Sequence, residues 1–427
     1  MSIEVLPLGM ACNLGCTYCY QQPVRDAGNA PGKLDYDMDA MKATLRKEGY
    51  KFSVFGGEPL LVPIDDLAEL WRFGYEEVGK AARDKGQAAN GIQTNGVLLT
   101  DKHIKLMRRY EVGVGVSIDG PGAMNDARWA GTLEATRAAT AKSQANLERL
   151  LGALERRPSI IVTLHALNGG TAAKIERLCK WLLALHAKGL RHVNVHLLER
   201  DTTAADKLQL STAQAVAAFR RLWQLHQETG MNVEPLSHMW QLLHGDDKNV
   251  SCVWNGCDPF TTAAVHGVGP QGQRLNCGRT YKDGVVAIKA EQQGFERYTQ
   301  LHAIPFADGG CSGCRFFYAC KGNCPGTGTD RDWRERTEHC GVLMQTFEFM
   351  EAQLVANGKV PFSLDERREV VERMMVAQWQ GGQQASVRHT LEAYGRGDTY
   401  SGEGRPDHGD VPHGDSHGDS DAPEVTT

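Results

Sequence analysis

The chain has 427 residues, of which 41% are hydrophobic and 23% charged, and its formal net charge at pH 7 is −5. This length can bury a large core, and the composition excludes collagenous and wholly disordered proteins. No apolar run approaches the roughly 18 residues of a membrane span, the start lacks the pattern of a secretory signal, and no basic run indicates nucleic acid. We therefore expect a cytoplasmic protein that engages neither membrane nor nucleic acid. The 12 cysteines are too few for a disulfide scaffold and indicate metal or redox chemistry in that compartment.

The first half of the chain alternates short β-rich runs with helical patterns. The predicted strands are residues 3–8, 52–55, 91–94, 112–118, 160–164 and 192–198. The predicted helices between them are residues 65–83, 101–110, 133–156 and 172–188. This alternation predicts an α/β fold with parallel strands and right-handed crossovers. Six units fall short of the eight that close a full barrel, so residues 1–235 are expected to form a partial (β/α)6 barrel with its chemistry on loops at the carboxyl ends of the strands.

The rest of the chain divides into three segments by composition. Residues 236–342 have few periodic patterns but hold eight of the 12 cysteines, so metal ligation is the expected organiser. Residues 343–395 are predicted to be helical, with capping-box spacing at Ser363 and Glu366. Residues 396–427 form an acidic tail with a recurring His-Gly-Asp at His408, His413 and His417. We expect this tail to be disordered, and metal binding by its histidines is the alternative.

Three closely spaced cysteines follow the first predicted strand. Cys12, Cys16 and Cys19 have the spacing C-x3-C-x2-C. A four-iron, four-sulfur cluster takes one outside ligand per iron, so three cysteines leave one iron open to bind another molecule. Zinc is the alternative, but it requires a fourth ligand, and neither a histidine nor a fourth cysteine lies near this loop in the sequence.

Three further segments end or follow the next predicted strands: Gly56-Gly57-Glu58-Pro59, Gln93-Thr94-Asn95-Gly96 and Ser117-Ile118-Asp119-Gly120. Together with the cysteine motif, they resemble the radical S-adenosylmethionine (radical SAM) enzymes. The resemblance implies that the open iron binds S-adenosylmethionine, that one electron cleaves it, and that the resulting 5′-deoxyadenosyl radical takes a hydrogen from the substrate. It also implies a place in the cofactor site for Tyr18, Gly56, Gly57, Glu58, Pro59, Asn95, Ser117 and Arg128. For Arg128 the alternative is a solvated surface arginine.

The downstream cysteines are Cys252, Cys257, Cys277, Cys311, Cys314, Cys320, Cys324 and Cys340. Eight thiolates suffice for two clusters, although structural zinc is the alternative for any single pair. Their order resembles the SPASM domain, a C-terminal extension of many peptide-modifying radical SAM enzymes. The resemblance implies one auxiliary cluster on Cys252, Cys257, Cys277 and Cys324, and a second on Cys311, Cys314, Cys320 and Cys340, giving three 4Fe–4S clusters in all. The isolated Cys179 lies in a helical pattern and is expected to be a small core residue.

The barrel motifs resemble both anaerobic sulfatase maturases and maturases of ribosomally made peptides. Sulfatase maturases carry an Asp base directly after the cysteine that corresponds to Cys277, whereas this chain has Gly278. Because oxidising a Cys or Ser side chain requires a proton acceptor, we favour the peptide maturases, which form a thioether, ether or carbon–carbon cross-link by a net two-electron oxidation. Formylglycine formation on a sulfatase is the alternative, and an iron–sulfur electron-transfer protein is the alternative of another class.

The resemblance also implies partners for such an oxidoreductase. These are a precursor peptide, a low-potential electron donor such as flavodoxin or ferredoxin, and, because the first strand begins at Ile3, a separate leader-binding protein or the region after residue 342. The sequence identifies no general base. Glu199 and Asp258 lie near the predicted site loops, but each is expected to be structural or solvent-facing.

Overall fold

The structure is a computed structural model that describes residues 3–25, 35–49, 51–262, 265–281, 283–288, 290, 292 and 294–397. The predicted tail lies outside the described residues beyond position 397, and with it the three histidines of its His-Gly-Asp repeat. No helix in the described part of the chain is both long and apolar enough to cross a bilayer.

Within the described residues, a nine-stranded sheet runs in the order β7-β6-β5-β4-β3-β2-β1-β8-β9. Its strands are β1 (Ile3–Val5), β2 (Phe52–Val54), β3 (Asn90–Thr94), β4 (Gly113–Ser117), β5 (Ser159–Leu164), β6 (His192–Leu197), β7 (Asn232–Glu234), β8 (His266–Val268) and β9 (Arg274–Leu275). Neighbouring strands pair in parallel except β8 and β9, which are antiparallel. The predicted α/β class and parallel sheet are confirmed, with all six predicted strands present. The sheet extends beyond them at both edges through strands of two or three residues, which are too short to produce a periodic pattern.

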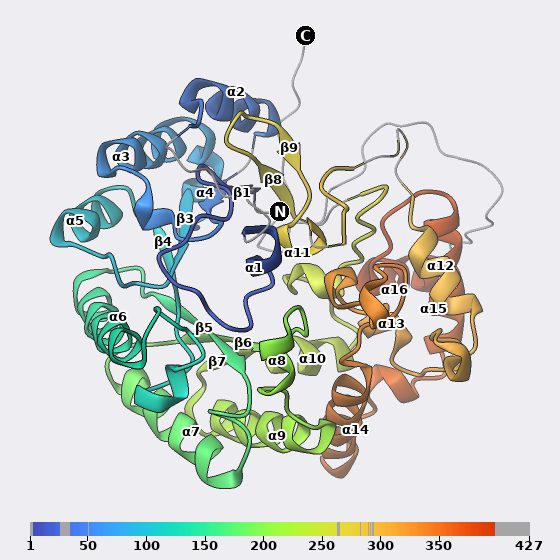
Figure 1. Ribbon diagram of the computed structural model, residues 1–427. Coiled ribbons are helices and arrows are strands. Elements are labelled where there is room, and N and C mark those ends of the chain that lie inside the picture. Colours follow the sequence, from blue (N-terminus) through green and yellow to red (C-terminus); the bar gives the residue numbers. More distant parts are fainter. Residues whose placement is uncertain are drawn as a thin grey trace.

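The sheet curves, and helices lie around its outer side (Figure 1). They are α2 (Met38–Glu48), α3 (Ile64–Phe73), α4 (Lys80–Asp84), α5 (Asp101–Arg109), α6 (Leu133–Ala153), α7 (Ala172–Ala187) and α9 (Thr212–Thr229). The predicted helix 65–83 is instead interrupted by a π-helical turn, Gly74–Val78. Gly74 packs so closely on β3 that a Cβ there would lie 1.7 Å from Asn90 Oδ1, so the strand contact disturbs the regular helix.

Side chains alternate along the strands between a hydrophobic core and a polar interior. Ile3, Val5 and Val54 are almost completely buried in the core. Glu4 and Ser117 lie on the opposite face of their strands and line the interior cavity. A full barrel fills its interior with bulky branched residues, whereas the polar side chains of this partial barrel leave room for a ligand.

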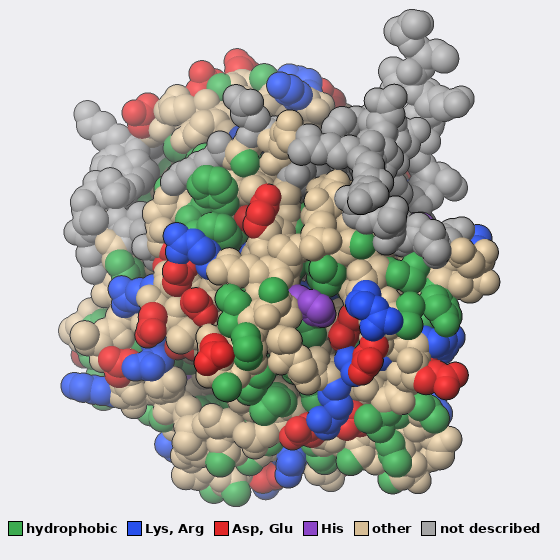
Figure 2. All heavy atoms as spheres, turned by 90° about the vertical axis from the view of Figure 1, so that its right-hand side faces the viewer, with side chains coloured by type: hydrophobic (Ala, Val, Ile, Leu, Met, Phe, Trp, Pro, Cys, Tyr) green, Lys and Arg blue, Asp and Glu red, His purple; other side chains and the backbone are tan. Residues whose placement is uncertain are grey.

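The cysteine-rich and C-terminal segments pack beside the open edge of the sheet (Figure 1). Their helices are α10 (Leu236–Leu243), α11 (Gly278–Tyr281), α12 (Glu296–Ala303), α13 (Phe317–Cys320), α14 (Cys340–Ala356), α15 (Arg368–Gln380) and α16 (Val387–Arg396). Two short helices of the first half of the chain are α1 (Gln22–Val24) and α8 (Thr203–Asp206). β8 and β9, from the cysteine-rich segment, join the sheet beside β1. Figure 2 shows acidic and basic side chains interspersed over the face that the C-terminal helices present.

The helical character predicted for residues 343–395 is present, but the predicted capping box at Ser363 is wrong. Helix α15 begins at Arg368, and its N-cap Arg367 makes no side-chain cap hydrogen bond. Ser363 Oγ instead donates to Glu351 Oε2 at 2.6 Å, while Asp365 Oδ1 accepts from the Arg367 amide at 2.8 Å. The local turn at Asp365 delays the helix, because a short acidic side chain competes with helical backbone bonding.

Candidate functional site

A cavity of about 460 Å³ lies on the inner side of the sheet. Its lining includes seven cysteines that are far apart in the sequence: Cys12, Cys16, Cys19, Cys252, Cys257, Cys277 and Cys324. It also includes the predicted cofactor-site residues Tyr18, Gly56, Gly57, Asn95, Ser117 and Arg128. The structure therefore brings the first cysteine motif, most of the predicted cofactor site and half of the downstream cysteines around one space.

The loop that carries Cys12 is held by backbone hydrogen bonds from the Gly-Gly-Glu-Pro turn. The Gly57 amide donates to the Gly9 carbonyl at 3.0 Å, and the Glu58 amide donates to the Ala11 carbonyl at 2.7 Å. A Cβ at Gly57 would lie 1.9 Å from the Ala11 oxygen. Gly56 has a φ of +114°, which a side chain would also strain. The two glycines are thus needed for the two loops to approach each other.

Glu58 and Pro59 are buried and are not among the residues that line the cavity. Glu58 Oε1 accepts from Thr94 Oγ at 2.6 Å and from the Leu60 amide at 3.0 Å, and Oε2 accepts from the Asn95 amide at 2.8 Å. Burial raises the pKa of Glu58, while these hydrogen bonds oppose the rise. The carboxylate thereby fastens the turn after β2 to the end of β3. Direct contact of Glu58 or Pro59 with a cofactor stays a prediction.

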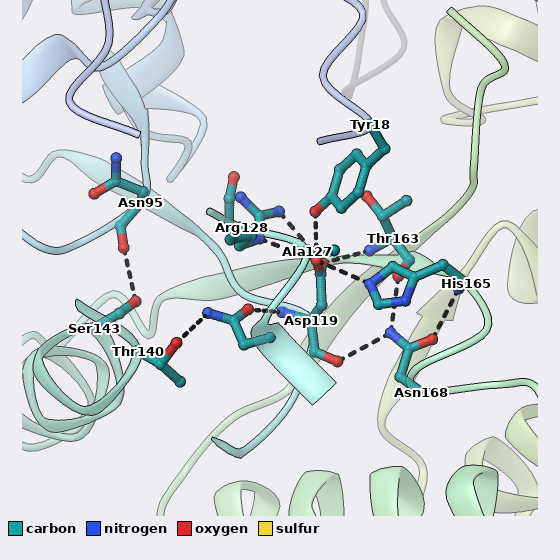
Figure 3. Close-up of polar contacts among 12 residues, drawn as sticks. Tyr18, Asn95, Asp119, Ala127, Arg128, Thr140, Ser143, Thr163, His165 and Asn168 are labelled. Atoms are coloured by element: carbon teal, nitrogen blue, oxygen red, sulfur yellow. Dashed lines mark hydrogen bonds and ion pairs between the residues drawn. The ribbon is translucent and has the colours of Figure 1, made fainter. Parts of the chain in front are cut away.

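A buried polar cluster around Asp119 forms another part of the site (Figure 3). Tyr18 Oη donates to Asp119 Oδ2, and the Thr163 amide donates to Oδ1 at 2.9 Å. His165 Nε2 lies 3.3 Å from Oδ2, and Arg128 Nε lies 3.2 Å from the same oxygen. Segments that follow β1, β4 and β5 thus meet on one carboxylate.

The charge of Asp119 is maintained by its partners. Burial alone raises the pKa of Asp119, but the Arg128 charge and the hydrogen bonds from His165 and Tyr18 outweigh burial and lower it to about 2. Arg128 is only 8% exposed, so the alternative of a solvated surface arginine is wrong. The ion pair fixes Arg128 and Tyr18, both of which line the cavity.

Four downstream cysteines are electrostatic neighbours at the cavity. Burial, followed by the thiols of Cys324 and Cys257, raises the pKa of Cys252 to about 12. Burial, followed by Glu4 and then Cys324 and Cys252, raises the pKa of Cys277. The structure thus places together the four residues that the SPASM resemblance implies for one cluster, which we call the inner set.

The other four cysteines form a second group, the outer set. Burial, followed by Cys314 and Cys340, raises the pKa of Cys311 to about 12, and the same three thiols raise that of Cys320 after burial. These side chains are not among the residues that line the cavity. Of the two downstream groups, only the inner set is therefore placed to act directly on a molecule bound there.

The thiol groups suit a larger inorganic group better than a single ion. In the part of the chain that the structure describes, which includes every cysteine, no three His, Cys, Asp or Glu side chains converge closely enough to hold one metal ion. A zinc ion draws four ligands to within about 2.3 Å of one point. A cluster with four irons holds its thiolates further apart, one on each iron. The donors are also thiols throughout, which favours iron–sulfur ligation.

Sequence reasoning missed three cations beside the cysteines, of which Arg297 and Lys321 are buried and Arg279 is partly buried. Arg279 donates to Cys324 Sγ at 3.9 Å and pairs with Glu199 at 3.0 Å. Arg297 donates to the Asn323 and Glu335 carbonyls at 3.1 and 2.8 Å and is 1% exposed. Lys321 Nζ donates to the Trp254 carbonyl at 2.7 Å. Arg279 and Lys321 could have been suspected because they lie close to Cys277 and Cys320 in the sequence. Arg297 has no such signal.

The remaining candidates have structural roles. Asp258 is buried and accepts from the Phe260, Thr261 and Arg297 amides at 3.0, 3.3 and 3.4 Å, so it holds a turn. Glu199 is ion-paired with Arg279. Cys179 is 1% exposed within the core on α7, as predicted.

We predict that Gly57→Ala prevents assembly of the cluster on Cys12, Cys16 and Cys19. The new Cβ would displace the Ala11 carbonyl, and with it the cysteine loop. If the chain holds three four-iron clusters, as its sequence predicts, reconstituted variant protein should lose about a third of its iron. Gly152→Ala is the control, because a Cβ there meets nothing within 4 Å and Ala favours the α6 helix. Equal iron in both variants would contradict the role assigned to Gly57.

We predict that Asp119→Asn destabilises the fold at neutral pH by about 3–5 kcal/mol, because it leaves buried Arg128 without its counter-ion. The pKa of Asp119 falls from 3.8 to about 2 in the folded protein, so its stabilisation is present above pH 4 and disappears as the pH falls through about 2. Urea denaturation from pH 7 down to pH 2 should show a constant difference between the two proteins above pH 4 and a narrowing difference below it. A constant difference across that range would contradict this interpretation.

The sequence of this chain is similar to a known protein family and to several curated proteins. Residues 6–182 match the model of the radical SAM superfamily. A serine-type anaerobic sulfatase-maturating enzyme of Bacteroides thetaiotaomicron is 33% identical over 131 residues, which is 29% of this chain and 30% of that protein. A cysteine-type anaerobic sulfatase-maturating enzyme of Clostridium perfringens is 28% identical over 127 residues, which is 28% of this chain and 33% of that protein. The matched region thus spans about a third of the length of these curated relatives.

The fold is similar over a much longer stretch. The solved structure of native anSMEcpe with bound AdoMet and Cp18Cys peptide has a TM-score of 0.62 and 18% identity, and covers 84% of this chain and 99% of that chain. At this identity the likeness is one of fold, and it includes the region beyond residue 182. The family match, the four motifs at successive strand ends and the shared fold agree in relating residues 6–182 of this chain to the radical SAM superfamily.

Proposed function

We propose that the protein is a radical SAM peptide maturase that oxidises a ribosomal precursor peptide by two electrons and closes a cross-link within it. The observation that supports this most directly is that Cys12, Cys16 and Cys19 line the same cavity as the inner set. A site for hydrogen abstraction and a site that accepts an electron would then face one bound peptide.

The group that the first three cysteines would hold is a 4Fe–4S cluster with one open iron, which supplies the electron that cleaves S-adenosylmethionine. The chain's own residues orient and enclose the reactants. Tyr18 and Arg128 are fixed by Asp119, and the Gly-Gly turn leaves backbone surface open to a ligand. Exclusion of water by these walls protects a reactive radical from side reactions.

The same proposal extends to the organisation of the chain. Residues 1–235 would form the radical SAM barrel, 236–342 a SPASM domain with two auxiliary clusters, and 343–395 a helical extension. Tyr18, Gly56, Gly57, Asn95, Ser117 and Arg128 would contact S-adenosylmethionine. The outer set, away from the cavity, would relay electrons between the inner set and a flavodoxin or ferredoxin.

Sulfatase maturation is the second candidate, because the two curated relatives reported above carry that activity in their names. The position after Cys277 favours the cross-linking peptide maturases instead. A Cβ at Gly278 would lie 3.5 and 3.6 Å from Gln21 and Tyr20, which is ordinary contact distance. A side chain would therefore fit at this position, but the chain has no carboxylate there. A sulfatase maturase would need its proton acceptor elsewhere in the cavity.

We predict that alanine at Cys12, Cys16 and Cys19 together abolishes 5′-deoxyadenosine formation in reconstituted, dithionite-reduced protein. The reason is that no thiolate would remain to hold the open-iron cluster. Cys179→Ala should retain full activity, because that thiol lies in the core. Continued cleavage in the triple variant would overturn the proposal, and cluster absorbance without any cleavage in the wild type would identify an electron carrier.

We predict that co-expression with a short precursor peptide gives a product lighter by two hydrogens, with fragmentation blocked across the linked residues. A peptide with the Cys or Ser recognition sequence of a sulfatase serves as the second arm. If formylglycine forms in that arm and the mass of the precursor peptide does not change, the protein is a sulfatase maturase and the proposed cross-linking is wrong. The two outcomes are separated by tandem mass spectrometry.

A further inference from the structure

The cavity is lined by three carboxylate side chains in the described residues, and their surroundings differ. They are Glu4, Glu199 and Glu234. Glu199 is ion-paired with Arg279 at 3.0 Å. Glu4 has an enclosed Oε2 without a hydrogen-bond partner and lies in the field of Arg279 and Cys277. Glu234 has two imidazole partners.

Glu234 closes β7 and sits between two histidines. Its Oε1 lies 3.2 Å from His192 Nε2 and 3.3 Å from His238 Nε2. Asn232 Nδ2 lies 3.0 Å from His192 Nδ1 and steadies that ring. His238 Nδ1 lies 3.4 Å from Ser251 Oγ, and Ser251 precedes Cys252 of the inner set. The carboxylate is therefore close to the wall that carries the inner set.

The two histidines differ in their access to solvent. The His192 side chain is 37% exposed, whereas that of His238 is 9% exposed. Glu234, at 12%, faces the cavity. A path of titratable atoms thus leads from the cavity through Glu234 to His192 and the outside, whereas the side chain of His238 is largely enclosed.

We propose that Glu234 accepts the proton released when the substrate is oxidised and that His192 passes it to solvent. This inference rests on the proposed function, in which a peptide carbon radical meets an X–H group of the same peptide. The carbon–X bond forms as the X–H bond breaks, one electron passes to a 4Fe–4S cluster on the inner set, and the proton passes to a Glu234 carboxylate oxygen. His192 then returns Glu234 to its ionised state.

The chemistry of Glu234 suits this task. Burial raises the pKa of Glu234 to about 7, against a smaller opposing effect of Asn232. An acceptor with a pKa near the working pH can both take up and release a proton. Burial lowers the pKa of His192, so its ring is neutral. Asn232 Nδ2 donates to Nδ1, which places the ring proton on Nε2. Passage of a proton through the ring therefore includes a change of tautomer, in which Nδ1 gives up its Asn232 contact and Nε2 becomes free to accept from Glu234.

The two histidines provide a matched test, since both contact the same oxygen. We predict that His192→Ala and Glu234→Gln reduce cross-linked product roughly 100-fold while 5′-deoxyadenosine still forms. His238→Ala should keep the wild-type ratio of product to 5′-deoxyadenosine, because it removes no route to solvent. Added imidazole should restore His192→Ala several-fold and leave Glu234→Gln unchanged. Iron content and melting temperature verify that each variant is folded and loaded.

A readout without cofactors comes from histidine-selective ¹⁵N NMR of iron-free protein. Because Glu234 and His192 share an oxygen–nitrogen contact, they titrate as a coupled pair, and Glu234→Gln should reduce the two-step titration of His192 to a single step. Glu176→Gln on the outer surface should leave both steps unchanged. Equal product losses in His192→Ala and His238→Ala, or a normal product ratio in Glu234→Gln, would overturn the relay. Absence of product and of 5′-deoxyadenosine in the wild type would instead overturn the proposed function.

Discussion

The close backbone contact between the loop after β1 and the turn after β2 determines where the first three cysteines lie. Two amide–carbonyl hydrogen bonds, from Gly57 and Glu58, join these loops. The loops can approach so closely because Gly56 and Gly57 have no side chain. Glu58 then secures the turn to β3 through three accepted hydrogen bonds. A buried acidic side chain is costly unless its oxygens are satisfied, so this anchor is strongly directional. The position of the cysteine loop is thereby coupled to the register of the sheet.

The inner face of the sheet is polar, and this polarity leaves space for the cysteine loop and a ligand. Helices on the outer side bury the apolar residues of each strand, so the fold does not require a packed interior. Charges can then be held inside the barrel when they are paired, as Asp119 is with Arg128 and Glu199 with Arg279. Removing one partner of such a pair is far more destabilising than the pair itself is stabilising. These pairs therefore fix the cavity walls more than they add to stability.

The sequence predicted the features that depend on periodicity and on local spacing. Strands β1–β6 repeat with helices between them, and the cysteine motifs are short enough to be read directly. What it could not predict depends on tertiary contacts. Strands such as β7 and β8 are too short to produce a pattern, yet β7 positions Glu234. Arg297 has no local signal, because its partners are backbone carbonyls 24 to 38 residues away. The capping box at Ser363 failed because the hydroxyl found a buried carboxylate instead.

Burial of the cysteines has a consequence for how the site is loaded. It raises the pKa of Cys16 and Cys252 to about 12, so the empty fold holds neutral thiols. A cluster binds thiolates, and loading must therefore displace protons, which links cluster affinity to pH. Nearby cations reduce this cost: Arg128 lowers the pKa of Cys16 and Arg279 lowers that of Cys252, each against the larger effect of burial. Because the same two arginines neutralise Asp119 and Glu199, they cannot be replaced without disturbing both the walls of the cavity and the charge on its thiolates.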